Sequence, residues 1–239
     1  IDGANVYVRH NLDVCTELSD NAQLVVNANK TLTVKNIITS KAPDNFVVES
    51  DGNLIQIEDE AVNSGSITAY RTMTPRRNLN EPYSPKEYSF YSSPVYGQNM
   101  KAIFGGNTAN TVFALVLNEP GNNFVNANAA HYNIPGKGFA VKDPTVVFVG
   151  SKVTVPATFV GKPNNGEIAV PVTLTGSKGW NLVGNPYPSN LDLKTFYTDN
   201  STVMDKDIRF WDKTVNATYS QYGGSYNGYS YAIYNADLD

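Results

Sequence analysis

The sequence predicts an all-β protein in which a short parallel β-solenoid segment is followed by a β-sandwich. Charged residues are only 17% of the chain. The polar share comes mainly from Asn, Thr, Ser and Gly, which favour turns and strand surfaces over helices. Residues 1–70 repeat with a period of about 22, a length typical of stacked β-rungs. Residues 88–239 contain short apolar runs separated by turn signals at roughly ten-residue spacing, the pattern of a sandwich.

The repeat consists of two blocks, each with two short strands joined by a turn rich in Asn, Asp or Gly. Aligning the blocks at an offset of about 22 residues places Leu24 on Phe46 and Leu32 on Leu54. One rung cannot bury its apolar face alone, so we expect the rungs to stack along a common axis. A vaguer first rung contains Val6, Val8 and Leu12. An alternative interpretation pairs the same strands as two antiparallel hairpins.

Residues 71–87 are predicted to be a Pro-rich connection between the two parts, because proline fits neither a helix interior nor a central strand. Both ends of the chain have strand-like sequence. We therefore expect the rungs to be the end of a longer solenoid and the sandwich to be truncated at its C-terminus. The strands of the sandwich are predicted at 88–92, 111–118, 138–142, 146–149, 153–159, 167–175, 208–212 and 226–235.

Local signals place turns and one helix in the second part. Residues 118–121 read Asn-Glu-Pro-Gly and predict a turn. Asn165-Gly166 predicts a hairpin turn before the alternating strand at 167–175. A short helix over 193–197 is predicted after Ser189-Asn190-Leu191-Asp192, whose polar side chains can cap it.

Longer motifs occupy the stretch from Tyr88 to Asp212. They are the strings YSSPV (91–95), GKGFAV (136–141), FVGKPNNG (159–166), GWNLVGNPYPS (179–189) and FWD (210–212). This stretch resembles a module of large secreted proteins of the Bacteroidota. Such modules lie near the C-terminal end of proteins exported by the type IX secretion system, after repetitive or solenoid regions. The string at 180–189 is the most specific part of the resemblance.

The resemblance implies export, an extracellular or outer cell-surface location, and a sorting domain downstream of this chain. Through that domain the protein would contact the type IX secretion machinery. The module contributes no catalytic residues. The motif at 179–189 also has a local structural interpretation, with Trp180, Leu182 and Val183 as a core strand. Tyr187, between two prolines, is then a corner residue whose hydroxyl needs a partner if it is buried.

Composition excludes several functional classes. A net charge of −4 argues against nucleic acid as a partner, and the one basic cluster, Arg71, Arg76 and Arg77, is better explained as a solvated connection. No apolar run approaches the 18 or so residues of a membrane span. Cys15 is the single cysteine, so no internal disulfide can form. The histidines, His10 and His131, suggest neither a catalytic triad nor a zinc site, and no cofactor is predicted.

Two groups of acidic residues are candidate chemical sites. Glu58, Asp59 and Glu60 follow a rung, but consecutive strand residues point to opposite faces, so at most two share a side. The acids at 199 and at 205–207 offer oxygen ligands without the spacing of a calcium loop. We therefore predict no catalytic residues, no metal site and no enzyme activity in this chain.

Tyrosines near the C-terminus are the candidate ligand-binding residues. Tyrosine among small polar residues makes a good contact surface, because a rigid amphipathic ring loses little entropy on binding. The candidates are Tyr222, Tyr226, Tyr229 and Tyr231. Alternatively, Tyr229 and Tyr231 simply alternate with Ser230 and Ala232 along an ordinary strand.

The sequence therefore favours a non-catalytic, structural or adhesive segment of a secreted or cell-surface protein, and cargo of type IX secretion. The alternative is a glycan-binding module of a secreted polysaccharide-active enzyme. Surface glycans or other cell-surface proteins are the expected partners.

Overall fold

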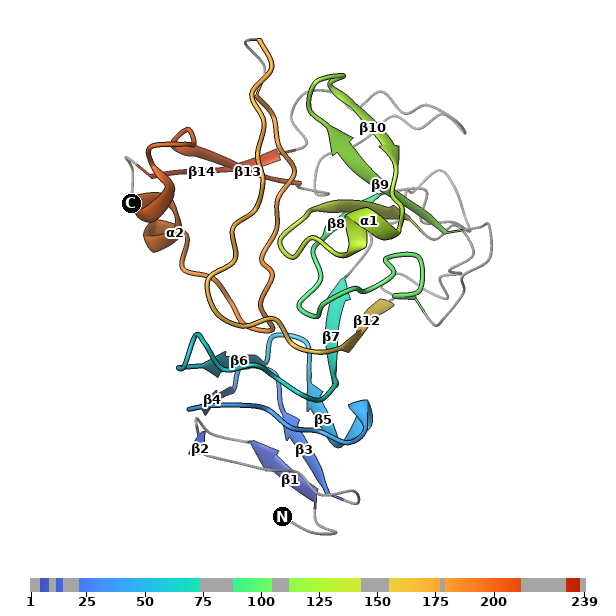
Figure 1. Ribbon diagram of the computed structural model, residues 1–239, viewed down its shortest axis with the longest axis vertical. Coiled ribbons are helices and arrows are strands. Elements are labelled where there is room, and N and C mark those ends of the chain that lie inside the picture. Colours follow the sequence, from blue (N-terminus) through green and yellow to red (C-terminus); the bar gives the residue numbers. More distant parts are fainter. Residues whose placement is uncertain are drawn as a thin grey trace.

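A computed structural model describes residues 5–8, 12–14, 22–73, 88–104, 112–142, 155–176, 179–211 and 231–236. The structure is mainly β, with several small sheets (Figure 1). Two parallel sheets lie toward the N-terminal end, and a four-stranded antiparallel sheet lies at the other end of the molecule. Among the described residues, no helix is long and apolar enough to cross a bilayer.

The larger sheet contains five strands in the order β1-β3-β5-β7-β12. Its bounds are β1 Asn5–Val8, β3 Gln23–Val26, β5 Phe46–Val48, β7 Ile67–Met73 and β12 Val155–Gly161. The first four strands pair in parallel, whereas β12 pairs with β7 in antiparallel orientation. A strand from the second half of the chain thus closes the parallel series.

The second parallel sheet has three strands in the order β2-β4-β6. They are β2 Leu12–Val14, β4 Thr31–Val34 and β6 Asn53–Gln56. Together, β1 to β7 form what we call the parallel stack, in which successive strands of the chain alternate between the two sheets.

The register of the parallel stack confirms the predicted repeat. Leu24 pairs with Phe46, and Leu32 pairs with Leu54. The antiparallel-hairpin alternative is wrong, because each strand pairs with its equivalent one repeat later rather than with its neighbour in sequence.

Two corner residues repeat in the same way. Asn29 and Asp51 occupy equivalent turns, both with positive φ, at 60° and 64°. The backbone N–H of Asn29 donates to the carbonyl of Asp51 at 2.9 Å. Asn and Asp tolerate this left-handed conformation better than most residues, so the polar corners specify the turn of each rung.

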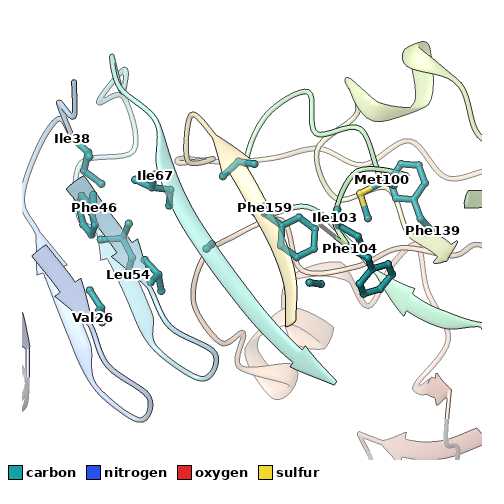
Figure 2. Close-up of a cluster of buried hydrophobic side chains, with 14 of the residues drawn as sticks. Val26, Ile38, Phe46, Leu54, Ile67, Met100, Ile103, Phe104, Phe139 and Phe159 are labelled. Atoms are coloured by element: carbon teal, nitrogen blue, oxygen red, sulfur yellow. The ribbon is translucent and has the colours of Figure 1, made fainter. Parts of the chain in front are cut away.

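One hydrophobic core runs through both parts of the molecule. In the parallel stack it contains Leu24, Val26, Phe46 and Leu54, all nearly or fully buried (Figure 2). It continues through β7 and β12 to side chains of the second part, including Met100, Ile103, Phe139 and Phe159. Because the core is continuous, we expect the described parts to unfold together.

The antiparallel sheet has the order β10-β9-β11-β8. Its strands are β8 Ser89–Tyr91, β9 Phe113–Asn118, β10 Asn123–Asn126 and β11 Phe139–Lys142. The predicted turn after Asn118 is confirmed, since it joins β9 to β10. A separate two-stranded ribbon consists of β13 Asp207–Trp211 and β14 Tyr231–Asn235.

The predicted helix is confirmed as α2, Leu193–Asn200, whose N-cap Asp192 accepts a bond from the N–H of Thr195 at 2.7 Å. The structure adds a 3-10 helix at Pro43–Asn45 and the single turn α1, Ala129–Tyr132. These were not predicted, because one turn leaves too little periodicity to detect.

Three expectations about residues 163–183 are wrong. Residues 167–175 form no strand and instead run out in an extended segment that returns before residue 183 (Figure 1). Asn165-Gly166 does not join two paired strands. Trp180 and Val183 are 47% and 40% exposed, so they are not core residues. An alternating sequence determines which residues share a face, but it does not provide a strand to pair with. Without a partner, the apolar side chains of this segment stay in solvent, and Leu174 is 75% exposed.

Several predicted features lie outside the described residues. They are most of the Pro-rich connection, the strand at 146–149, Arg76, Arg77, Cys15 and His10. Arg71 lies within β7, partly buried, and donates to the carbonyl of Tyr70 at 2.9 Å. Burial lowers the pKa of Arg71, and the nearby carboxylate of Asp51 partly offsets that effect.

Candidate functional site

Four of the five motif strings meet at one place, which we call the motif junction. It contains residues 58–61, 92–96, 136–138, 162–166 and 182–190. Asn164 lies buried at its centre. Its side-chain amide donates to the carbonyls of Ser93 at 3.2 Å and Pro186 at 2.9 Å. Its backbone N–H donates to Pro94 at 3.0 Å. One buried side chain therefore ties three separate motifs together.

Asn165 connects the junction to the end of the parallel stack. Its side-chain nitrogen faces the carbonyls of Glu58 at 2.8 Å and Asp59 at 3.3 Å. A third carbonyl, that of Ala61, lies at 3.2 Å. Gly166 has a φ of +74°, and a Cβ there would lie 2.5 Å from the Asp59 carbonyl oxygen. Glycine is required at this position by both conformation and space.

Tyr187 confirms the predicted corner residue. Its hydroxyl donates to the carbonyl of Gly166 at 2.7 Å, and its backbone N–H donates to the side chain of Asn185 at 2.9 Å. Burial raises the pKa of Tyr187, and the negative charge of Asp59 adds to that effect. The hydroxyl thus remains a protonated donor at neutral pH.

Two motif strings pair through their backbones. Gly138 donates to the carbonyl of Leu182 at 3.0 Å, and Gly184 donates to that of Gly136 at 2.9 Å. A Cβ on Gly138 would lie 2.9 Å from the Leu182 carbonyl oxygen, and one on Gly184 would lie 2.5 Å from Cβ of Ser92. Side chains at these positions would separate the strings.

A second amide, Asn63, links the motif junction to the interior of the parallel stack. It is 5% exposed, accepts from the N–H of Ile38 at 2.9 Å, and donates to the carbonyl of Pro163 at 3.1 Å. Gln56 exchanges two further hydrogen bonds with it, at 2.9 and 2.7 Å. Every hydrogen-bonding group of this buried amide is engaged.

The motif junction also covers the outer edge of β6. The backbone N–H of Leu54 points away from β4 and donates to the carbonyl of Pro188 at 2.8 Å. The N–H of Asn190 donates to the side chain of Asn53 at 2.7 Å. Both parallel sheets therefore end against segments from the second half of the chain, since β12 covers β7.

The predicted tyrosine site is described only in part. Tyr222, Tyr226 and Tyr229 lie outside the described residues. Tyr231 begins β14, is 42% exposed, and pairs with Trp211 of β13. The two rings meet edge to face with centroids 5.2 Å apart.

Trp211 is anchored to the antiparallel sheet. Its ring stacks on Phe90 of β8 at 5.4 Å and 26°. Phe90 in turn contacts Phe124 of β10 at 6.2 Å. Aromatic contacts of this kind contribute about 0.5–1.5 kcal/mol beyond the area they bury, so the ribbon has a firm attachment at this end.

Sequence reasoning missed a neighbouring pair, Trp180 and Arg209. The Arg209 guanidinium lies over the Trp180 ring at 4.6 Å, and both side chains are exposed. Trp180 was assigned to a core strand by its apolar neighbours. No spacing rule relates these two positions, so the pair could only be found in the fold.

Glu119, in the β9–β10 turn, holds the extended segment. Its carboxylate is nearly covered and accepts from the N–H groups of Thr175 at 2.9 Å and Gly179 at 3.2 Å. The hydrogen bond from Thr175 is the main reason why the pKa of Glu119 is lowered. The carboxylate therefore stays ionised and bound at neutral pH.

The acidic residues and the histidine considered as catalytic candidates take part in structural contacts or lie exposed. The backbone carbonyls of Glu58 and Asp59 accept hydrogen bonds from the side chain of Asn165, and the side chains of both acids are exposed. His131 accepts the N–H of Asn128 at 3.1 Å in the cap of α1. Within the described residues, no group of three or more His, Cys, Asp or Glu is placed to hold a metal ion.

Comparison with known families gives one match. A family model described as Domain of unknown function (DUF8693) matches residues 5–238, from β1 to beyond β14. The chain belongs to this family. No curated protein and no solved structure matches it. In this DUF8693 chain, the family match therefore includes both the parallel stack and the motif junction.

Proposed function

We propose that this chain is a non-catalytic structural segment of a secreted or cell-surface protein, in which a β-sandwich closes the end of a parallel β-solenoid. One observation carries the proposal. The outer edges of both parallel sheets are occupied by segments from the second half of the chain, β12 on β7 and Pro188 on Leu54.

The physical reason is the need to finish a stack of rungs. A last rung presents unpaired N–H and C=O groups and an apolar face, and such an edge pairs with other chains. Repeat arrays therefore require terminal caps. Here β12 pairs in antiparallel orientation, and Pro188 belongs to a segment that cannot continue as a central strand. Both features stop the series from growing.

The export route is part of the same proposal. The motif strings resemble those of type IX secretion cargo, and the low charge content suits an extracellular β-protein. The outer cell surface is the proposed location, with contact to the secretion machinery through a sorting domain downstream. Four of the five strings also build the motif junction.

The capping role is tested by Asn165→Ala. We expect a loss of about 1–3 kcal/mol in the free energy of unfolding, because the carbonyls of Glu58 and Ala61 lose their donor. Size-exclusion chromatography should also show new oligomers as the edge of the stack opens. The matched control is Asn126→Ala, on the exposed strand β10. If Asn165→Ala is as stable as Asn126→Ala, and both variants elute as monomers, the capping role is wrong.

Export is tested separately in the producing bacterium. Antibodies against this chain should label intact cells, and labelling should disappear when the secretion system is inactivated. Label that appears only after the cells are permeabilised would refute the proposed location.

A second function, glycan binding, is favoured by one specific observation. Tyr231 and Trp180 leave 42% and 47% of their surfaces exposed near the ribbon. Flat exposed aromatic rings of this kind provide stacking surface for sugars.

A further inference from the structure

One face of the β13–β14 ribbon gathers Arg209, Trp211 and Tyr231. Alternate residues of a strand share a face, which places Arg209 beside Trp211. Cross-strand pairing places Tyr231 directly opposite Trp211. Arg209 lies close enough to Tyr231 for its positive charge to offset part of the burial effect that raises the pKa of the tyrosine.

Trp180 completes this face from a different segment. Its ring lies against the guanidinium of Arg209 at 4.6 Å. Trp180 and Tyr231 are 47% and 42% exposed, so ring surface remains open to solvent near the fixed cation. We call Trp180, Arg209, Trp211 and Tyr231 the ribbon platform.

Contacts to two other segments hold the ribbon platform in place. Trp211 stacks on Phe90. The segment that carries Trp180 is fixed by Asn181, which exchanges two hydrogen bonds with the backbone of Thr173, at 2.8 and 3.1 Å. A surface that is already ordered loses little conformational entropy when a ligand binds.

The charge of the platform selects the ligand. The guanidinium of Arg209 contacts the Trp180 ring, and the carboxylate of Asp207 on the same face accepts a hydrogen bond from Asn235 at 2.6 Å. A guanidinium presents a planar fork of donors that matches a carboxylate. The neighbouring ring faces are electron-rich and attract the C–H faces of sugar rings.

We propose that the ribbon platform binds an acidic polysaccharide, a chain of pyranose units that carry uronate carboxylates. Sugar rings stack on Trp180 and Tyr231, and a carboxylate pairs with Arg209. This inference rests on the second proposed function, glycan binding, and deepens it by naming the ligand class. It does not depend on whether the motif junction caps the parallel stack.

Affinity electrophoresis tests the inference in native gels that contain polygalacturonate, alginate or the neutral polymer dextran. The full chain should be retarded by at least one of the acidic polymers and not by dextran. Trp180→Ala and Arg209→Gln should each weaken the interaction about tenfold. The protein carries a net charge of −4, so general attraction to a polyanion does not explain retardation.

The matched control is Tyr96→Ala. Tyr96 is 52% exposed and lies 5.9 Å from the ammonium group of Lys162, outside the ribbon. Retardation should survive this change. Circular dichroism spectra and melting temperatures must match the native protein for each variant to count, and Trp180→Phe serves as a milder change if Trp180→Ala unfolds.

Four outcomes would overturn the inference. The first two are no retardation by either acidic polymer and equal retardation by dextran. The third is retardation that is unchanged in Arg209→Gln. The fourth is self-association that disappears in Trp180→Ala, which would mean that a second copy of the chain occupies the platform. Unfolding and oligomer measurements on Asn165→Ala report on the motif junction alone, so failure of the capping role can be told apart from failure of glycan binding.

Discussion

The parallel stack and the motif junction keep one chain folded by different means. In the parallel stack, apolar side chains recur in register, and the backbone of each strand pairs with its equivalent one repeat away. In the motif junction, buried amides bind carbonyls of distant segments, and glycines allow backbones to touch. A repeat builds its own core, whereas a cap must recognise the last rung through specific polar contacts.

The largest effect is expected from Phe46→Ala in the parallel stack. Phe46 is fully buried in β5, so truncation should cost about 3–5 kcal/mol of unfolding free energy. Urea unfolding followed by circular dichroism measures this loss. Ile55→Ala, at a side chain that is 44% exposed on β6, is the control and should cost much less. Equal losses would mean that the apolar repeat does not form the core.

Asn164→Ala should rank second and should break the motif junction. Removing the amide leaves the carbonyls of Ser93 and Pro186 without their donor, at a cost of about 2–3 kcal/mol. The same urea titration measures it, with Asn126→Ala as the exposed control. A loss no larger than that of the control would show that apolar packing alone holds the junction.

Tyr91→Phe should produce a smaller effect of opposite sign. The Tyr91 hydroxyl is buried and has no hydrogen-bond partner in the described part of the chain, and burial strongly raises its pKa. Its ring packs against Phe104 and Phe159. Removing an unsatisfied hydroxyl while keeping the ring should stabilise the protein by about 1 kcal/mol. Destabilisation of that size would reveal a partner for the hydroxyl.

The smallest effect concerns Glu119 and pH. Its pKa is lowered in the folded protein, so its contribution to stability is complete at neutral pH and is lost as pH falls through the lowered pKa. Between about pH 5 and pH 3, the urea midpoint of the native protein should fall more steeply than that of Glu119→Gln. Asp192 also has a lowered pKa but is present in both proteins, so its contribution cancels. If the urea midpoints of the two proteins fall in parallel with pH, Glu119 does not contribute to the pH dependence of stability.

The parallel stack could be predicted because its information is local and repeated. Aligning Leu24 with Phe46 gave both the strands and their register. The corner residues Asn29 and Asp51 also follow the repeat. For the second part, apolar runs located most of the described strands but not their partners. Residues 167–175 show the limit, since alternation without a pairing partner produced no strand.

The motif junction and the ribbon platform could not be predicted, because their contacts join distant positions. Asn165 and Glu58 lie 107 positions apart, and Asn-Gly normally indicates a hairpin turn. Tyr187 was the exception, since a tyrosine between two prolines indicated a corner residue whose hydroxyl needs a partner if it is buried, and the structure supplies that partner. Trp180 and Arg209 belong to separate segments and carry no shared signal.

Amide hydrogen exchange at Leu54 distinguishes a covered edge of β6 from an open one. On an open edge of a sheet, this outward N–H would exchange rapidly. Since it donates to the carbonyl of Pro188 at 2.8 Å, we expect exchange as slow as that of the core amides of β4, governed by global unfolding. Rapid exchange at Leu54 beside slow exchange in β4 would mean that the edge is uncovered, and would contradict the capping of the parallel stack by the second half of the chain.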